Sequence, residues 1–351
     1  MTGWPDPSLR HLAEMTDEIG VVEHAELARP RRELGYCTDD AGRLLAVASR
    51  LAFDPDALRL ATVALELLAR GHRGDGAFRL RLGADRHWTD DPPSDDAAGR
   101  ALLGLGTAVA TAPWAAVQTV ALELFDAAMG FRSAHPRALG YAVLGAAGVL
   151  QVIPEHVGAR RLIEDARDLL PTPTKDLDWP WPAASLTYAN ALLPHASLIA
   201  AVLSGRGDDV TTALWLLEWL VCEETSEGHF SFAPVAGRRR GGPKPAFDQQ
   251  PIEAWTMAEA CACAYSCTGD PQWAATAARA AAWFLGENDL EVKMYDSISG
   301  GGYDGLGQEG VNRNQGAESS LAFVASMGLA RAVQRQEPGA APPCADRRAR
   351  R

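Results

Sequence analysis

The strongest constraint on the fold of this chain is a series of six segments that are apolar on almost every side beyond their first turn. A helix that is apolar all round must be buried all round. The six segments are residues 39–52, 95–110, 135–150, 187–203, 249–265 and 314–330. Amphipathic segments lie between them, each with one polar stripe that suits a helix facing solvent. This alternation predicts an inner ring of buried helices inside an outer ring of amphipathic ones.

The amphipathic segments carry signals for the starts of helices. Asp54 and Asp270 each precede a proline, which is the pattern of an N-cap followed by the first helical position. Further outer helices are expected within residues 7–19, 113–129, 154–170 and 208–224. We therefore expect an all-α fold, an (α/α)6 toroid with short β-hairpin loops on one face. Residues 1–335 are predicted to form a single toroid domain, followed by a disordered tail at 336–351.

Charge and motif content exclude several classes of function. The formal net charge of −12 argues against a nucleic-acid partner, because phosphate binding needs a basic surface. No uninterrupted apolar run could span a membrane and no apolar signal core begins the chain, so we expect a cytoplasmic protein. Phosphate-loop and dinucleotide fingerprints are absent, so we expect no cofactor and no metal. The acid-rich segment 89–100 leaves calcium binding as a weaker alternative.

Two of the predicted inner helices begin with the same pattern of charges. The two copies are Asp39–Asp40–Arg43 and Asp95–Asp96–Arg100. Inner helices of a toroid run parallel, so their N-termini meet at one face, where we expect a cleft. One aspartate of each pair can cap its helix, but Thr38 and Ser94 can serve instead and release both carboxylates. We expect at least one aspartate per pair to face the cleft, with the arginines as its structural partners.

A cleft with several carboxylates, amides and aromatic side chains suits a carbohydrate. Cleavage of a glycosidic bond needs one protonated carboxyl and one carboxylate. The candidate catalytic residues are Asp40, Asp96, Glu253 and Glu318. Glu253 is the preferred general acid, because desolvation inside an apolar helix raises a carboxyl pKa. Glu318 is the reserve acid, and either aspartate could be the base.

Other polar and aromatic residues near the predicted helix starts are candidates for binding the substrate. Hydroxyl groups of a sugar would meet carboxylate, amide and basic side chains, and its ring faces would meet aromatic ones. The candidates are Tyr36, Asp39, Asp95, His135, Arg137, Trp181, Tyr188, Asn190, Gln250, Asp304, Asn314 and Gln315.

The chain resembles a bacterial family of six-hairpin, glycosidase-like proteins that are often encoded beside or fused to glycosyltransferases. The resemblance extends from about Gly20 to Ala332. Its most specific stretches are "GYCTDDAGRLL", "SDDAAGRALLGLG", "WPWPAASLTYANALLPHA", "FDQQPIEAWTMAEACACAY" and "GGGYDGLGQEGVNRNQGAESSLAF". It implies an (α/α)6 toroid, a carbohydrate-related role, an oligosaccharide or glycoside as substrate, and a glycosyltransferase as partner.

The sequence departs from the family pattern at several polar positions. Relatives tend to carry a Phe-Glu-Asp step after "WPW" and an aspartate before the asparagine of "LTYxNA". Small residues, among them Ala183, Ala184 and Ala189, stand there in this chain. Either the chemistry depends on the four remaining carboxylates, or this member has lost or changed its activity.

Three functions therefore remain open. The first is glycoside hydrolysis by two carboxylates. The second is carbohydrate binding without catalysis, by a binding or scaffold protein associated with a glycosyltransferase. The third is sugar isomerisation or epimerisation, which usually depends on a pair of histidines. Only His135 and His195 lie near predicted inner-helix starts.

Overall fold

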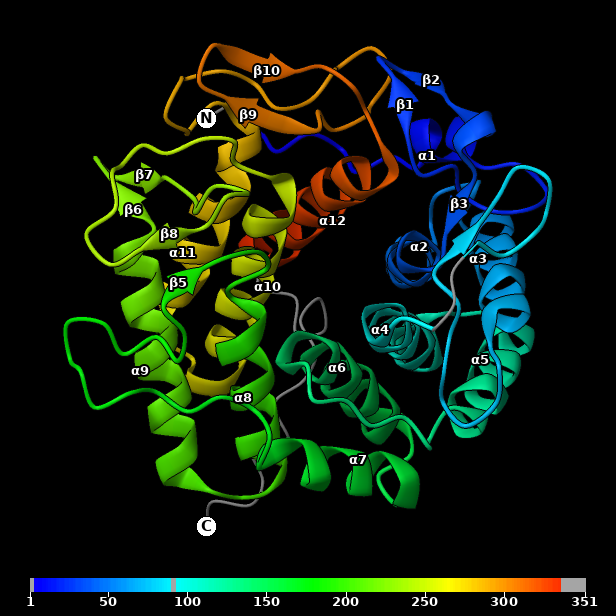
Figure 1. The fold of residues 1–351 in the computed structure, drawn as a ribbon, viewed down its shortest axis with the longest axis horizontal. Helices are drawn as coiled ribbons and strands as arrows, with labels where there is room; N and C mark the ends of the chain where they lie inside the picture. Colours follow the sequence, from blue (N-terminus) through cyan, green and yellow to red (C-terminus); the bar gives the residue numbers. More distant parts are fainter. Residues whose placement is uncertain (1–2, 90–92, 336–351) are drawn as a thin grey trace.

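The computed structural model describes residues 3–89 and 93–335 and shows helices arranged in two concentric rings (Figure 1). The inner ring contains α2 (Thr38–Arg50), α4 (Asp95–Thr111), α6 (Pro136–Val152), α8 (Leu192–Leu203), α10 (Pro251–Thr268) and α12 (Ala317–Gln334). Each inner helix contacts the next, and α12 contacts α2, so the ring is closed. The prediction of an (α/α)6 toroid is confirmed. The predicted tail at 336–351 lies outside the described residues.

The outer ring follows the amphipathic segments. It contains α1 (Arg10–Met15), α3 (Ala57–Gly71), α5 (Ala115–Ala127), α7 (Val157–Arg167), α9 (Gly207–Glu223) and α11 (Pro271–Ala282), and two short 3-10 helices lie at Arg32–Leu34 and Trp283–Leu285. Asp270 caps α11 as predicted, accepting the N–H of Gln272. The cap predicted at Asp54 is wrong, because α3 begins at Ala57 and Asp54 instead accepts the N–H of Leu9.

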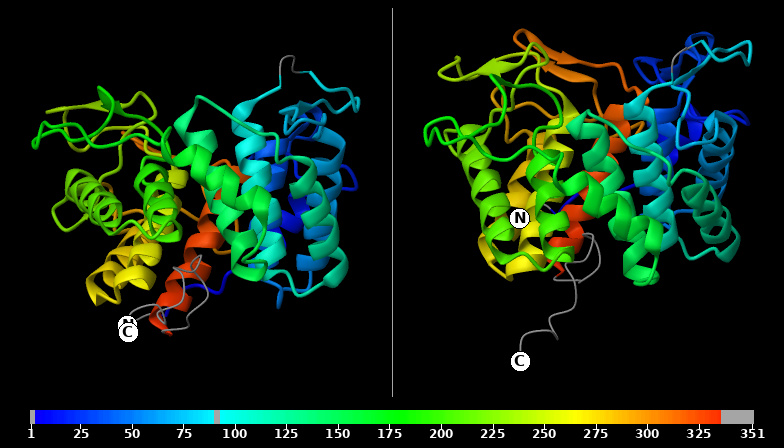
Figure 2. Two further views of the ribbon diagram at one scale, coloured as in Figure 1. Left: turned by 90° about the horizontal axis from the view of Figure 1, so that it is seen from below. Right: turned by 60° about the horizontal axis from the view of Figure 1, so that its bottom comes forward.

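Short strands and long loops gather at the end of the toroid where the inner helices begin, and we call this end the N-terminal face (Figure 2). Three strand pairs are hairpins: β1 (Ala25–Glu26) with β2 (Arg29–Pro30), β6 (Thr225–Ser226) with β7 (His229–Phe230), and β9 (Gly305–Gly307) with β10 (Gly310–Asn312). Two pairs join distant segments: β3 (Tyr36–Cys37) with β4 (Arg81–Leu82), and β5 (Ser185–Leu186) with β8 (Arg238–Arg239). The predicted hairpins on one face are therefore present.

Glycines allow the backbones of α2, α4 and α6 to touch. A Cβ atom on Gly42 would overlap the carbonyl oxygen of Arg100, and one on Gly106 would overlap that of Gly145. Packed interiors leave no free volume to absorb such an overlap. These glycines therefore fix how closely the inner helices that carry the paired aspartates approach one another.

A glycine-to-alanine substitution should change the free energy of unfolding in opposite directions at two positions on the inner helices. Gly106→Ala forces two backbones apart and should lower the free energy of unfolding by about 1–3 kcal/mol. Gly328→Ala should raise it by about 0.5–1 kcal/mol, because a Cβ there meets only Leu51 at 3.5 Å and alanine favours helix. Urea denaturation of both variants checks this. Equal effects at the two positions would contradict the proposed role of the glycine contact.

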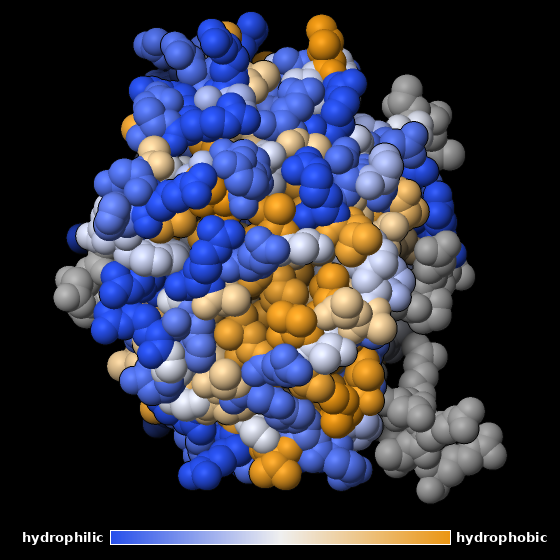
Figure 3. Space-filling view, turned by 90° about the vertical axis from the view of Figure 1, so that its right-hand side faces the viewer, coloured by the Kyte–Doolittle hydropathy of each residue, from blue (hydrophilic) through white to orange (hydrophobic). Residues whose placement is uncertain are grey.

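The outer surface includes an apolar area on the side formed by α3 and α5 (Figure 3). Leu58 on α3 and Val120 on α5 are exposed large hydrophobic side chains.

Within residues 3–89 and 93–335, every helix is too short or too polar to span a membrane.

Candidate functional site

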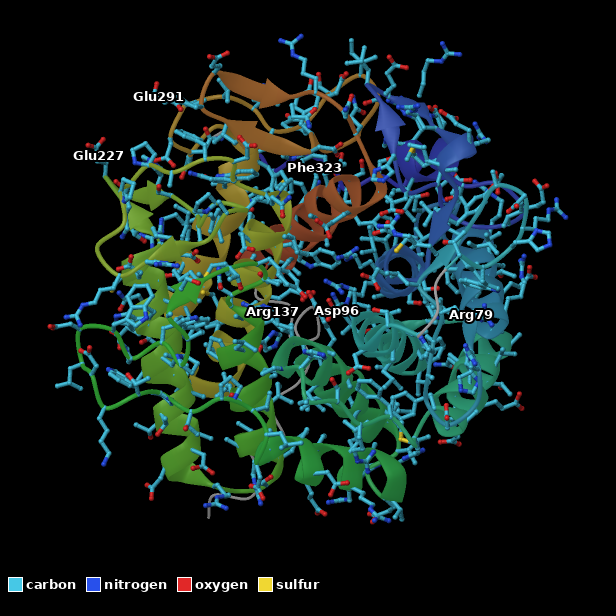
Figure 4. All side chains as sticks on the ribbon, viewed as in Figure 1. Arg79, Asp96, Arg137, Glu227, Glu291 and Phe323 are labelled. Atoms are coloured by element: carbon cyan, nitrogen blue, oxygen red, sulfur yellow. The ribbon has the colours of Figure 1, made fainter. Side chains whose placement is uncertain are left out.

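The start of α4 leaves both carboxylates of the second aspartate pair available. Ser94 caps the helix by accepting the N–H of Ala97, so neither aspartate has to serve as the cap. Asp95 accepts a hydrogen bond of 2.5 Å from the hydroxyl of Ser133. Asp96 accepts a hydrogen bond of 2.7 Å from the hydroxyl of Tyr188, and its side chain is 37% exposed. Asp96 lies near the middle of the ring, unlike the peripheral Glu227 and Glu291 (Figure 4).

The two repeated motifs are joined across the helix interface. Arg100 of the second motif donates to Asp39 of the first at 3.0 Å, and it lies 3.7 Å from Asp96. Its guanidinium is buried and lies 4.7 Å from the centre of the Tyr141 ring. A buried cation needs compensating charge and hydrogen bonds. The repetition of the pattern is explained in part by this pairing between adjacent helices.

The arginine of the first motif also connects two carboxylates. Arg43 donates to Asp40 at 2.6 Å and to Glu318 of α12 at 2.5 Å. Burial raises the pKa of Asp40 to about 7, although the positive charge of Arg43 opposes this shift. Asp40 is 3% exposed, whereas the side chain of Glu318 is 38% exposed. Of the two carboxyls on Arg43, only Glu318 can readily meet a ligand.

We call the two arginines and their carboxylates the network; its members are Asp39, Asp40, Arg43, Asp96, Arg100 and Glu318. The segment before α8 brings Tyr188 into contact with this network at Asp96. Arg137 donates to the carbonyl oxygen of Tyr188 at 2.5 Å and stacks on its ring at 4.8 Å. Arg137 also donates to the hydroxyl of Thr187 at 2.6 Å and to the amide oxygen of Asn190 at 3.4 Å. Arg137 and Asp96 are both labelled near the middle of the ring in Figure 4. Arg137, Tyr188 and Asp96 therefore form one continuous polar surface.

Glu253, the predicted general acid, lies behind this surface. Its carboxylate accepts the backbone N–H groups of Ala189 at 2.5 Å and Asn190 at 3.2 Å, and the side-chain amide of Asn190 at 3.3 Å. Burial raises its pKa, with a contribution from the nearby Glu224, while the backbone donors oppose the shift. The expected pKa direction is present, but Glu253 is 3% exposed and both its oxygens are engaged. This arrangement suits a residue that positions the turn of Tyr188.

Several predicted binding residues do not join the network. Trp181 is 1% exposed and stacks on Trp219, so it packs in the core and offers no face to a sugar. The hydroxyl of Tyr36 donates to Asp17 at 2.7 Å, within a buried contact. His135 is exposed at the start of α6, where its side chain provides no cap.

Other candidates on the loops before α10 and α12 hold the backbone. Asp304 accepts the N–H of Gly316 at 2.8 Å, immediately before α12. Asn314 accepts the N–H of Leu27 at 2.9 Å, and Gln315 accepts the hydroxyl of Ser299 at 2.6 Å. The protein itself thus engages the carboxyl of Asp304 and the side-chain oxygens of Asn314 and Gln315. Gln250 is the N-cap residue of α10 but makes no cap with its side chain, so its amide is available.

Tyr141, whose ring lies against Arg100 of the network, was missed by the sequence analysis. It lies one turn after Arg137 on α6, and this i, i+4 spacing was a signal that both face the same way. Its buried hydroxyl has no hydrogen-bond partner among the described residues. Burial also raises its pKa.

Neither metal nor paired-histidine chemistry is favoured by the described residues. No group of three or more His, Cys, Asp and Glu side chains in residues 3–89 and 93–335 is placed to hold a metal. His195 on α8 is buried, and burial lowers its pKa to about 4. It is therefore neutral at physiological pH, and His135 is exposed at the start of a different helix.

Comparison with known proteins finds the fold but no family: no protein-family model matches the chain, and no curated protein matches it. Among solved structures, cellobiose 2-epimerase from Bacillus thermoamylovorans is 11% identical with a TM-score of 0.70, covering 93% of this chain and 96% of that one. Cellobiose 2-epimerase from Spirochaeta thermophila is 14% identical with a TM-score of 0.67, covering 93% and 94%. The cellulase CEL9M of C. cellulolyticum is 10% identical with a TM-score of 0.55, covering 90% and 87%. At these identities the likeness establishes the shared toroid fold.

Proposed function

We propose that this protein is a carbohydrate-active enzyme that hydrolyses a glycosidic bond, with Asp96 and Glu318 as its catalytic carboxyls. The observation that carries the proposal is their shared setting. Each is more than one-third exposed at the N-terminal face, each comes from a different inner helix, and each lies against a buried arginine. Two carboxyls on opposite sides of a bound sugar are what acid–base cleavage of a glycoside requires.

The surroundings of Asp96 and Glu318 bear on which of them is the base and which is the acid. Asp96 lies beside Arg100 and accepts the hydroxyl of Tyr188, and these two contacts hold its carboxyl in a fixed orientation. Glu318 shares Arg43 with the buried Asp40. Burial raises the pKa of Asp40 to about 7, so Asp40 is the member of this pair that holds a proton near neutral pH. Glu318 is the carboxyl of the pair that a ligand can reach, and we propose it as the acid with Asp96 as the base.

The remaining polar groups fit sugar recognition. Arg137, Tyr188 and Gln250 lie at the starts of neighbouring inner helices or the turns that precede them. Sugar hydroxyls both donate and accept hydrogen bonds, and these three side chains offer both kinds of group. The tyrosine ring adds an apolar surface for the face of a sugar ring.

The test is an assay of anomeric proton signals by NMR with manno-, gluco- and galacto-oligosaccharides. We expect turnover by the wild type, and a loss of about 100-fold or more in kcat for Asp96→Asn and for Glu318→Gln. Glu309→Gln, an exposed residue of the β9–β10 turn at the same face, is the matched control and should retain activity. The first anomer released distinguishes inversion from retention. Sugar binding without turnover would instead support a binding protein.

Epimerisation is the second candidate, because the fold comparisons include cellobiose 2-epimerases and a D-mannose isomerase. The same NMR assay separates the two reactions. An epimerase would convert a reducing-end sugar without releasing a new reducing end. His135 is exposed at the start of α6, whereas His195 is buried, so these two histidines do not present a pair of accessible imidazoles.

A further inference from the structure

A cavity lies at the opposite end of the toroid from the candidate catalytic residues. Its volume is about 570 Å³, within the range of small-molecule sites. It is lined by the C-terminal ends of α2 and α12, by the end of α4, and by Glu259 at the middle of α10. Arg50 in its wall lies ten residues after Asp40 on α2, which corresponds to about 15 Å along the helix axis. The cavity is therefore separate from the N-terminal face.

One part of the cavity wall is polar and the rest is largely apolar. Arg50 donates to Glu259 at 2.5 Å, and their side chains are 25% and 11% exposed. Ser49, 1% exposed, also lines the cavity, and its hydroxyl has no hydrogen-bond partner within the described residues. Apolar side chains contribute much of the remaining wall, among them Val47, Leu51, Val324 and Leu329. A ligand that satisfies both parts must have a polar end and an apolar body.

The charges around the cavity favour a neutral polar end. Arg50 is paired with Glu259, and Arg331 is paired with Asp6. Arg335, the remaining charged residue of the lining, is exposed to solvent. Paired charges largely cancel each other's attraction for an ionic ligand. They still offer hydrogen-bond donors on the arginine and acceptors on the carboxylate. Hydroxyl groups of a ligand meet this combination without bringing a charge into a partly buried site.

We propose that this cavity binds a neutral amphipathic molecule, with hydroxyl groups held by Arg50 and Glu259 and an apolar chain along Leu51 and Leu329. The probe that matches this chemistry is n-hexyl β-D-glucoside. Hexanoate and hexylammonium carry the same chain with a negative or positive end. Methyl β-D-glucoside carries the same sugar without the chain.

The experiment measures binding of the four probes to the full chain by isothermal titration calorimetry. The hexyl glucoside should bind more tightly than each of the other three. Gly328→Leu should weaken its binding by about tenfold or more, because the new side chain enters the cavity from α12. Gly328→Ala is the matched control, since its Cβ meets only Leu51 at 3.5 Å and leaves most of the volume open. Both variants should fold, as leucine and alanine favour helix over glycine.

A second variant tests the role of the charge pair. Glu259→Gln leaves Arg50 uncompensated, so hexanoate should bind several-fold more tightly than to the wild type. Three results would overturn the proposal: equal binding of all hexyl compounds, unchanged binding in Gly328→Leu, or loss of binding in Asp96→Asn instead. The last would place the glucoside at the N-terminal face. Failure of hydrolysis at that face leaves this test unaffected.

Discussion

Replacing Arg43 by methionine should lower the free energy of unfolding by about 3–5 kcal/mol at pH 8, because it leaves two carboxylates without their shared cation. Arg43 is buried and binds both Asp40 and Glu318. Methionine fills much of the same volume, so loss of packing contributes little. The magnitude follows from removing one partner of a buried ion pair while the other charges stay in place.

The loss of stability caused by Arg43→Met should be smaller at pH 5 than at pH 8, and the direction of this change follows from the pKa of Asp40. Its pKa rises from 3.8 to about 7 on folding. The folded state therefore binds more protons than the unfolded state between these values, and the stability that Asp40 contributes is lost as pH rises through 7. At pH 5, Asp40 is protonated in the folded state and depends little on Arg43. Urea denaturation at pH 5 and pH 8 measures the difference.

Asp40→Asn supplies the control in a double-mutant cycle. Asparagine keeps the shape and an acceptor for Arg43 but does not titrate. The cost of Arg43→Met at pH 8 should be smaller in the Asp40→Asn background than in the wild type. An equal cost at both pH values and in both backgrounds would show that packing, rather than charge, is what Arg43 contributes.

The toroid could be predicted because its main determinant is present in each segment separately. An apolar surface on every side of a helix specifies burial without any knowledge of its neighbours. Ser94 caps α4, which is one of the alternatives that the sequence left open, whereas Thr38 is itself the first residue of α2 and no side chain caps that helix. The predicted cap at Asp54 was wrong because α3 begins later, at Ala57, and the Asp54 carboxylate accepts the N–H groups of Asp56 and of the distant Leu9.

The partners of the polar side chains could not be predicted, because they depend on contacts between helices far apart in the sequence. Arg100 binds Asp39, sixty-one residues away, as well as lying near Asp96 on its own helix. Asp304 and Gln315 have the residue types that sugars prefer, yet the protein uses them to hold its loops. Trp181 lies in a proline-rich segment that suggested exposure, but stacking on Trp219 buries it. Residue type indicates what a group can bind, and packing decides what it does bind.

Replacing Glu253 by alanine should have the second large effect, a loss of about 2–4 kcal/mol in the free energy of unfolding. The substitution leaves the N–H groups of Ala189 and Asn190 buried without acceptors. The lost contacts also hold Ala189 at a φ of 46°, in the left-handed region where residues other than glycine are uncommon, so the turn should change conformation without them.

Glu253→Gln distinguishes a positioning role from a purely structural one. Glutamine keeps the volume, but its amide nitrogen must face one of the N–H groups that the carboxylate now accepts. The turn should shift, and the contact between the Tyr188 hydroxyl and Asp96 should weaken. Carbon-13 labelling of the tyrosine ring allows this to be followed by NMR, where the Tyr188 signal should move. Glu259→Gln, in the same helix but paired with Arg50, should leave it in place. A variant of Glu253 that loses stability while the Tyr188 signal stays unchanged would show that Glu253 supports the fold without positioning the site.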